Sequence, residues 1–396
     1  MKRVGNLYEK LISDENLSKA IDEVNKSHHW RTHHRPNPCT AWVEETKPER
    51  IEELKNVIEA GFRAKPPRIK ERYDASAQKV RVISEPIQWP DQYVHHALIQ
   101  VLQPIFMRGM DEFCCGSIKG RGTHYGKKSI EKWLKADPKG TRYELCCDIY
   151  HFYNSLTPET VMRRMRDLIK DYRILDLIER VIKNGIMIGA YTSQWFANVT
   201  LQPLDMMVRQ SGLCAHYLRY MDNIHIFGGN KRKLRKLKYF IEVWLHDRGL
   251  KLKGDWQIFP VEYANRRECG AGTCGRLPDA VGYRYGRNTD GSVYTIPRKH
   301  TLIRLKRKIS IYHKKVRSGK PIHPTVAAGL LSRLGQLDHC NNHNLYQMVY
   351  AEGKLNKSLK KIVREKQRKE NLTWNMYLTQ RRALKHSEQK ELPTAI

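Results

Sequence analysis

The chain has 396 residues, enough to bury a sizeable core and to form two or three subdomains. Its 72 Lys and Arg against 41 Asp and Glu leave a net charge of +31, which makes nucleic acid the expected partner. No apolar run approaches the roughly 20 residues that span a bilayer, and the start lacks the apolar segment of a secretory signal. These features argue against a membrane protein and predict a cytoplasmic location.

The first part of the chain is predicted to form helices followed by a hairpin. Residues 4–27 and 47–60 carry apolar positions at helical spacing. The segment 68–83 alternates on both sides of a small-residue turn, which predicts a β-hairpin with Lys and Arg on one face. Such a face would grip a nucleotide triphosphate through Lys79 and Arg81, although an ordinary solvated hairpin is an equal alternative.

A buried strand then leads to the first conspicuous carboxylate. A helix is expected over 90–107, and the glycine-rich basic loop 116–124 suits either an approach to phosphates or a plain flexible loop. The apolar run 144–148 predicts a strand that ends at Asp148, just before an aromatic pair. Taken alone, Asp148 would be interpreted as a turn cap.

A second carboxylate follows in a similar setting. Residues 186–195 predict a glycine turn that leads into a helix ending near Met207. The stretch 219–227 predicts two short strands around a tight turn that displays Asp222. Two carboxylates at adjacent strand ends, in a chain this basic, indicate a divalent-metal site for nucleotidyl transfer.

The remaining chain is basic and increasingly helical. Residues 231–245 predict an amphipathic helix whose dense cations favour phosphate contact. Strands are expected over 250–259 and 280–285, and basic helices from residue 298 onwards.

In this order, the motifs resemble those of a reverse transcriptase of the group II intron-like prokaryotic superfamily. The quoted motifs are Lys79-Val80-Arg81, Asp148 with Phe152-Tyr153, Ile188-Gly189 to Gln194, Tyr220-Met221-Asp222-Asn223, and Val281-Gly282-Tyr283. Group II intron and retron enzymes usually carry Gln-Gly-x-x-x-Ser-Pro in the third motif. Here residues 188–194 have the form aliphatic-Gly-x-x-x-Ser-Gln, which is similar to reverse transcriptases of diversity-generating retroelements. The stretches 5–10 and 254–257 are similar to that family too.

The resemblance implies an α+β, right-hand polymerase fold. Its parts would be fingers, a palm made of an antiparallel sheet plus helices, and a helical thumb. The expected boundaries are an N-terminal helical extension at 1–60, fingers with the start of the palm at 61–145, the palm with the active site at 146–292, the thumb at 293–370, and a C-terminal tail at 371–396.

It also implies an activity and partners. The enzyme would use dNTPs to copy a template-repeat RNA into adenine-mutagenised cDNA for targeted gene diversification, in a bacterial or phage-infected cell. Template RNA, the cDNA/RNA duplex and a small basic accessory variability protein are the implied partners. Two alternatives stay open: a catalytically degenerate polymerase-fold protein that binds RNA, and a group II intron-like or retron-like reverse transcriptase of ordinary fidelity.

Roles for individual residues follow from the same resemblance. Asp148 and Asp222 would bind two Mg²⁺ ions together with the main-chain carbonyl of Ile149. Either Lys251 or Lys253 would protonate the leaving group. The implied substrate-binding residues are Lys79, Arg81, Tyr153 (as a steric gate against ribose), Ile188, Gly189, Gln194, Tyr220, Gly282 and Tyr283.

Two positions depart from the usual pattern. Ile188 replaces an amide side chain near the templating base, and the loss of that polar restraint is a physical hypothesis for low fidelity. Asn223 stands where the family usually has a second Asp, which removes a negative charge near two cations. We expect an active enzyme with an altered metal preference, and the degenerate RNA-binding protein is the alternative.

Overall fold

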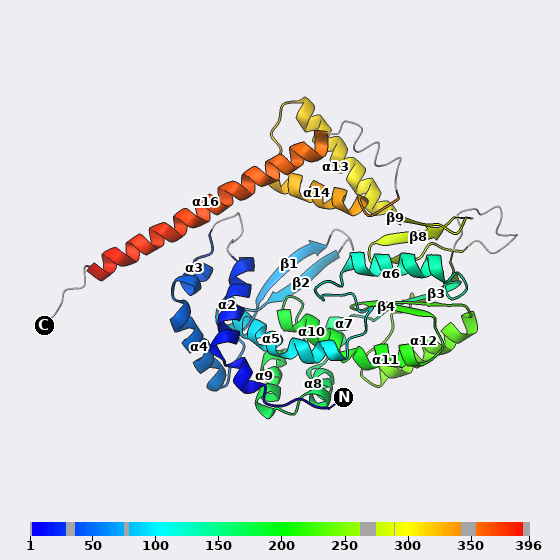
Figure 1. Ribbon diagram of the computed structural model, residues 1–396, viewed down its shortest axis with the longest axis horizontal. Coiled ribbons are helices and arrows are strands. Elements are labelled where there is room, and N and C mark those ends of the chain that lie inside the picture. Colours follow the sequence, from blue (N-terminus) through cyan, green and yellow to red (C-terminus); the bar gives the residue numbers. More distant parts are fainter. Residues whose placement is uncertain are drawn as a thin grey trace. The chain divides into compact units, whose positions relative to one another are not determined.

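The computed structural model describes residues 2–28, 36–74, 79–261, 275–288, 290–341 and 354–390 (Figure 1). The chain divides into two compact units. In the described chain, the first unit takes in 2–28, 42–261 and 275–276, and the second takes in 36–41 and the residues from 277 onwards. Each unit is considered by itself below.

Helices of the first unit pack around one central apolar helix. The N-terminal elements are α1 (Tyr8–Leu11), α2 (Asp14–His28), α3 (Pro38–Glu45, which belongs to this unit from residue 42 on), α4 (Lys47–Glu59), the π-helical turn η2 (Gln88–Gln92) and α5 (Tyr93–Arg108). Helix α5 packs against α2 and α4, and the Tyr93 hydroxyl donates a hydrogen bond to Asn25 Oδ1 at 2.8 Å. The helices predicted over 4–27, 47–60 and 90–107 are therefore confirmed.

The predicted hairpin is a two-stranded antiparallel ribbon, β1 (Arg68–Asp74) and β2 (Lys79–Glu85). Arg72 lies opposite Arg81, and Lys70 lies opposite Ile83. Because directly opposite residues share a face of an antiparallel pair, these side chains form the predicted basic face. The other face carries exposed apolar side chains: Ile69, Tyr73, Val80 and Val82.

A four-stranded antiparallel sheet forms the centre of the first unit. Its strands are β3 (Tyr143–Asp148), β4 (His216–Tyr220), β5 (Asn223–Gly228) and β6 (Gln257–Pro260), in the order β4-β5-β3-β6. The two innermost strands, β3 and β5, are rich in buried apolar residues, as strands covered on both faces require.

Helices cover both faces of this sheet. On one face, Trp133 of α6 (Thr123–Ala136) contacts Phe227 of β5, with ring centroids 6.2 Å apart. On the other face, Leu234 of α12 (Lys231–His246) packs over Gly228. The remaining helices of this unit are α7 (Phe152–Ser155), α8 (Pro158–Leu168), α9 (Tyr172–Ile182), α10 (Tyr191–Thr200) and α11 (Gln202–Gln210).

The strand expected over 250–259 is shorter than predicted. Only β6, Gln257–Pro260, pairs along β3, while a turn at Gly254 and Asp255 interrupts the run. The preceding residues cross the end of β3, where Tyr150 N donates to Lys251 O and Lys253 N donates to Asp148 O, both at 2.8 Å. The interruption therefore places two lysines beside Asp148.

The described residues from 277 onwards form a small sheet and three helices. The strands are β7 (Asp279–Ala280), β8 (Tyr283–Arg287) and β9 (Val293–Pro297), and the helices are α13 (Lys299–Arg317), α14 (Pro324–Leu337) and α16 (Lys354–Lys390). One apolar cluster joins the helices: Leu305, Ile309, Tyr312, Ala327, Leu330, Leu334, Leu337 and Leu359. The expected boundary between the thumb and the C-terminal tail, at residues 370 and 371, falls inside α16, which continues through residue 390. The domain boundaries stay predictions.

The helices of the described chain give no candidate for a membrane crossing, since none is both long and apolar enough.

Candidate active site

The sheet brings Asp148 and Asp222 to the same end. Asp148 is the last residue of β3, and its register partner in β5 is Asn223, the residue after Asp222. Asp222 lies in the tight turn between β4 and β5, and its backbone carbonyl accepts a hydrogen bond from Ile149 N at 3.2 Å. Two carboxylates 74 residues apart in sequence are thereby neighbours.

The electrostatics of this pair are those of crowded anions. Burial and then the nearby Asp222 carboxylate raise the pKa of Asp148 from 3.8 to about 7. Burial and the Asp222 charge also raise the pKa of the Tyr153 hydroxyl, which places Tyr153 close to the pair. Within the described chain, the buried Asp148 Oδ1 atom has no hydrogen-bond partner. An added cation would relieve both the repulsion and this unsatisfied oxygen.

The donor set suits a hard divalent cation. Mg²⁺ is usually held by one or two carboxylates together with substrate phosphates, and it keeps several waters. The described residues contain no group of three or more His, Cys, Asp and Glu that would form a closed metal cage. An open pair of carboxylates therefore fits a metal shared with a phosphate substrate.

A buried ion pair supports the turn that carries Asp222. The Arg219 guanidinium donates to both carboxylate oxygens of Asp205, each at 2.7 Å, and both side chains are fully or almost fully buried. Arg219 Nη1 also donates to Met221 O at 3.0 Å and to Asn198 Oδ1 at 2.9 Å. Met221 has φ +55°, a left-handed conformation that is strained for a non-glycine residue. The network holds this conformation in place.

The loop before α6 closes over the same turn. Asn198 Nδ2 donates to Gly116 O at 2.8 Å, and Cys115 N donates to Arg219 O at 2.8 Å. A Cβ atom on Gly116 would lie 2.6 Å from Met221 Cγ and 2.8 Å from Met221 N. In the loop predicted over 116–124, Gly116 therefore serves a close approach, whereas Gly120 and Gly122 face open space.

Sequence reasoning missed this support. Arg219 stands directly before the predicted turn, but nothing in the sequence pairs it with an aspartate in a helix 14 residues upstream. An aspartate among apolar residues in 202–208 is the one available signal, since a buried acid requires a partner.

The two candidate proton donors have different neighbours. Lys251 Nζ lies 4.5 Å from the ring centroid of Tyr150. Lys253 Nζ forms an ion pair with Asp255 at 2.5 Å, and this hydrogen bond raises the pKa of Lys253. Both lysines are exposed and lie near the end of β3.

The turn at Ile188 and Gly189 contacts the hairpin. Ser84 N donates to Ile188 O at 2.8 Å, and a Cβ on Gly189 would lie 2.7 Å from Ile83 Cγ2. Gly189 has φ +118°, so this close approach and this backbone both favour glycine. Since Ile83 lies on the basic face of the ribbon, that face, with exposed Arg81, is turned toward Gly189. The side chain of Lys79 is not in the part of the chain that the structure describes.

The other predicted residues occupy varied settings. Gln194 is exposed on α10, and Tyr220 lies opposite Asn223 in the register of β4 and β5. Asn223 is exposed, and its Nδ2 donates to Asp222 Oδ1 at 3.3 Å. Gly282, with φ +92°, forms the β7–β8 turn of the second unit, and Tyr283 is buried there.

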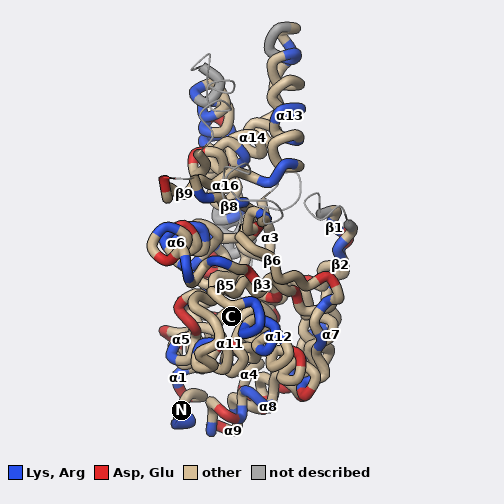
Figure 2. Tube along the Cα trace, turned by 90° about the vertical axis from the view of Figure 1, so that its right-hand side faces the viewer, with Lys and Arg blue, Asp and Glu red and all other residues tan. Residues whose placement is uncertain are grey.

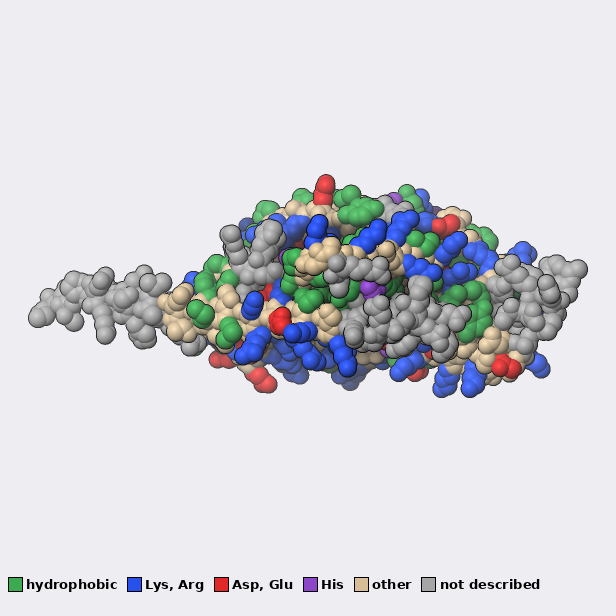
Figure 3. Space-filling model, turned by 90° about the horizontal axis from the view of Figure 1, so that it is seen from above, with side chains coloured by type: hydrophobic (Ala, Val, Ile, Leu, Met, Phe, Trp, Pro, Cys, Tyr) green, Lys and Arg blue, Asp and Glu red, His purple; other side chains and the backbone are tan. Residues whose placement is uncertain are grey.

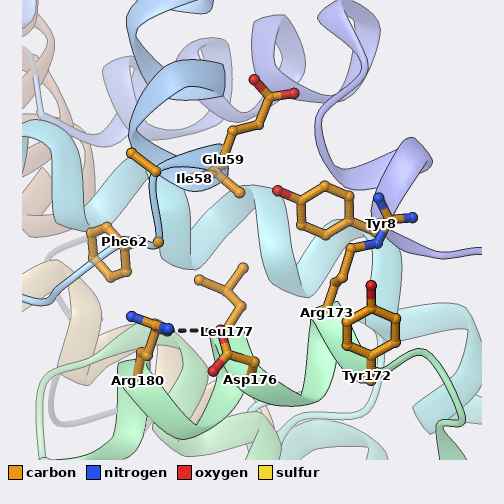
Figure 4. Close-up of a pocket in the computed structure, with 11 residues that line it drawn as sticks. Tyr8, Ile58, Glu59, Phe62, Tyr172, Arg173, Asp176, Leu177 and Arg180 are labelled. Atoms are coloured by element: carbon orange, nitrogen blue, oxygen red, sulfur yellow. Dashed lines mark hydrogen bonds and ion pairs between the residues drawn. The ribbon is translucent and has the colours of Figure 1, made fainter.

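A separate cavity of about 490 Å³ lies among α1, α4 and α9 (Figure 4). Its two arginines are already paired, Arg180 with Asp176 at 2.7 Å and Arg173 with Glu9 at 2.8 Å. None of the residues that line it is among the predicted site residues.

A comparison with protein families finds a match within the first unit. Residues 68–255 match the family described as reverse transcriptase (RNA-dependent DNA polymerase). The chain thus carries a reverse transcriptase domain with the mixed helices and antiparallel sheets of that polymerase fold. This is the domain of an RNA-directed DNA polymerase, a nucleotidyltransferase. No curated protein matches the chain.

Similar solved structures include two telomerases. One is apo telomerase from Candida tropicalis truncated from the C-terminal domain, with a TM-score of 0.42, 14% identity, and coverage of 59% of this chain and 55% of that chain. The other is telomerase from Candida albicans in complex with a fragment of telomeric RNA, with a TM-score of 0.44, 13% identity, and coverage of 78% and 60%. The chain therefore spans less than two thirds of the length of either telomerase.

Proposed function

We propose that the reverse transcriptase domain at 68–255 belongs to a working enzyme that copies an RNA template into cDNA by nucleotidyl transfer. The observation that carries this proposal is the Asp148–Asp222 pair, with its raised Asp148 pKa and its unsatisfied Oδ1 atom. A bound cation would stabilise both carboxylates of such a pair in their ionised form at neutral pH. The Lys and Arg side chains spread over the surface in Figure 3 suit a polyanionic template.

Asp148, Asp222 and the Ile149 carbonyl would hold two Mg²⁺ ions. When bound, Mg²⁺ supplies charge stabilisation at the phosphates and lowers the pKa of the attacking hydroxyl. Both carboxylates must be ionised for this, which fixes the lower pH limit of the reaction.

The chain's own residues perform the remaining tasks. Either Lys251 or Lys253 would donate a proton to the pyrophosphate leaving group, since a lysine is protonated at neutral pH, and Asp255 raises the pKa of Lys253 further. The basic face of the hairpin, including Arg81, would bind the triphosphate. Tyr153 beside Asp222 would occupy the space of a ribose 2′-hydroxyl.

The more specific proposal is that this enzyme is the reverse transcriptase of a diversity-generating retroelement. Residues 188–194 support it, because Ile188 offers an apolar, half-buried side chain where an amide would restrain the templating base. The cDNA of a template-repeat RNA would then carry errors opposite adenines. A small basic accessory protein would be its partner, in the cytoplasm of a bacterial or phage-infected cell.

The test is Mg²⁺-dependent cDNA synthesis by the full chain on a primed RNA template. Asp148→Ala and Asp222→Ala should each abolish synthesis, while Asp247→Ala, an exposed carboxylate at the end of α12, should leave it intact. Synthesis that survives Asp148→Ala would refute the proposed site. Absence of synthesis in the unmodified chain, with RNA bound, would favour a degenerate polymerase.

The error rate of cDNA synthesis distinguishes a diversity-generating enzyme from a reverse transcriptase of ordinary fidelity. Sequenced products should show errors concentrated at template adenines, and Ile188→Gln should reduce them. Accurate synthesis by the unmodified chain would retain the polymerase and dismiss the diversifier. Adenine errors that are unchanged in Ile188→Gln would dismiss the role of Ile188.

A further inference from the structure

The outer face of α12 carries a cluster of exposed cations. Its inner face holds the sheet through Leu234, Leu237, Ile241 and Leu245. The exposed face begins with five cations that form no ion pair in the described chain: Lys231, Arg232, Lys233, Arg235 and Lys236. No Asp or Glu occurs from 229 to 241, and the first acid, Glu242, is paired with Lys238 at 2.5 Å. We call these five residues the α12 basic cluster.

The stability of the helix does not explain this cluster. Like charges three and four residues apart on a helix repel one another. Cations in the first turns also face the positive end of the helix dipole. Both effects destabilise α12, and a bound polyanion would neutralise them.

Exposed aromatic side chains continue the basic cluster along the helix. The Tyr239 side chain is 61% exposed and lies one turn beyond Arg235 and Lys236. Phe240 is 36% exposed, and Lys236 Nζ lies 5.6 Å from its ring centroid. Cations that contact phosphates beside aromatic rings that stack on bases are the recognition pattern of single-stranded nucleic acid.

This surface lies away from the catalytic carboxylates. Asp148 shares a face of the sheet with its register partner Asn223, whereas α12 packs on the other face, over Gly228. The cluster also starts just after β5, whose six residues place it about 17 Å along the strand from Asn223. Figure 2 shows the blue Lys and Arg positions along α12. A nucleic acid bound here is therefore a different segment from the one being copied.

We propose that the outer face of α12 binds single-stranded RNA outside the copied segment, and so tethers the template molecule to the enzyme. The basic cluster contacts successive phosphates, and Tyr239 and Phe240 stack on bases. This inference rests on the proposed function only in that the bound RNA is the polymerase template.

The test compares two fluorescent substrates in equilibrium binding to the full chain without dNTPs. One is a short primed RNA template, and the other is the same template with a single-stranded uridine extension. The extension should tighten binding to the unmodified chain. The triple variant Arg232→Ala/Arg235→Ala/Lys236→Ala should lose this gain, and its salt slope should fall by about 2, at about 0.7 for each phosphate contact. In Tyr239→Ala, the increase in affinity that the extension gives should be smaller by a factor of about five or more.

The matched control removes the same charge elsewhere. Lys10→Ala/Lys19→Ala/Lys26→Ala takes three exposed cations from α1 and α2, where acids are interspersed, and should retain the gain. An equal loss in both triple variants, or an unchanged gain in the α12 variant, would overturn the proposal. A double-stranded extension that binds as well would also overturn it.

Synthesis on the short template distinguishes this proposal from the proposed function. It should be equal in the α12 variant and in the unmodified chain, which shows that the variant is folded and active. A chain that gains affinity from the extension but makes no cDNA would retain the α12 surface and refute the polymerase. A chain that makes cDNA but gains no affinity from the extension would retain the polymerase and refute the α12 surface.

Discussion

Arg219 Nη1 donates a hydrogen bond to Met221 O across 3.0 Å, so a fully buried guanidinium holds the residue directly before Asp222. Met221 is left-handed, and Gly116 packs against it from the side. The position of Asp222 is thus set by contacts beneath the turn.

The first prediction concerns the partner of Arg219. Asp205→Asn leaves the guanidinium buried without a counter-charge, and we expect a loss of about 3–5 kcal/mol in unfolding free energy. The measurement is urea unfolding. Asp176→Asn changes the same group in an exposed ion pair of equal length with Arg180, and its midpoint should not move. Equal midpoints for the two variants would show that the buried pair is not a stabilising element.

A second prediction tests the close approach at the turn. In Gly116→Ala, the new Cβ would meet the backbone nitrogen of Met221 at 2.8 Å, and backbone cannot yield without moving Asp222. We expect kcat for primer extension to fall by about tenfold or more, because small misplacements of catalytic groups are costly. Gly122→Ala, in the same loop but facing open space, should keep kcat. Full activity in Gly116→Ala would contradict the proposed positioning.

The third prediction is a pH dependence of stability in the metal-free protein. The pKa of Asp148 is about 7 in the folded chain, against 3.8 for an ordinary aspartate. Because the folded state holds this proton more tightly, the contribution is fully present below pH 3.8 and is lost as the pH rises through about 7. The urea concentration at the unfolding midpoint should therefore be lower at about pH 8 than at about pH 5. This difference should be smaller in Asp148→Asn.

Added Mg²⁺ should oppose the fall of the urea midpoint with rising pH in the unmodified chain. Metal ligands must be deprotonated, so added Mg²⁺ should raise the midpoint more at the higher pH than at the lower. Asp148→Asn should not respond in this way. A response of equal size in that variant would place the metal elsewhere.

The fourth prediction concerns the residue that departs from the usual pattern. Asn223 Nδ2 now donates to Asp222 Oδ1, and Asn223→Asp replaces that donor with another anion. We expect half-maximal synthesis at a lower Mg²⁺ concentration, because a third carboxylate strengthens cation binding. The measurement is a Mg²⁺ titration of primer extension beside the unmodified chain. An unchanged titration would show that Asn223 does not contribute to metal binding.

The elements around the site were predictable because their signals are local. Alternation predicted the hairpin at 68–83, the apolar residues before Asp148 predicted its strand, and the tight turn predicted the strands that display Asp222. The strand expected over 250–259 was wrong in length, because Gly254 and Asp255 form a turn within an otherwise alternating run.

The supports of the site were not predictable, because they depend on tertiary contacts. The partnership of Arg219 with Asp205 and Asn198 joins a strand to two helices, and no periodicity records it. Gly116 looked like one of several loop glycines, and only its distance from Met221 separates it from Gly120 and Gly122.

The order β4-β5-β3-β6 has a consequence for the synthesis of the protein on the ribosome. Asp148 leaves the ribosome early, but its neighbours in the sheet, β5 and β6, are made only as the chain reaches residues 228 and 260. Until then β3 has exposed edges, which are prone to pairing with other chains. Truncated products that end before Asn223 therefore carry an aggregation-prone strand and no paired carboxylates, and expression should be designed to avoid them.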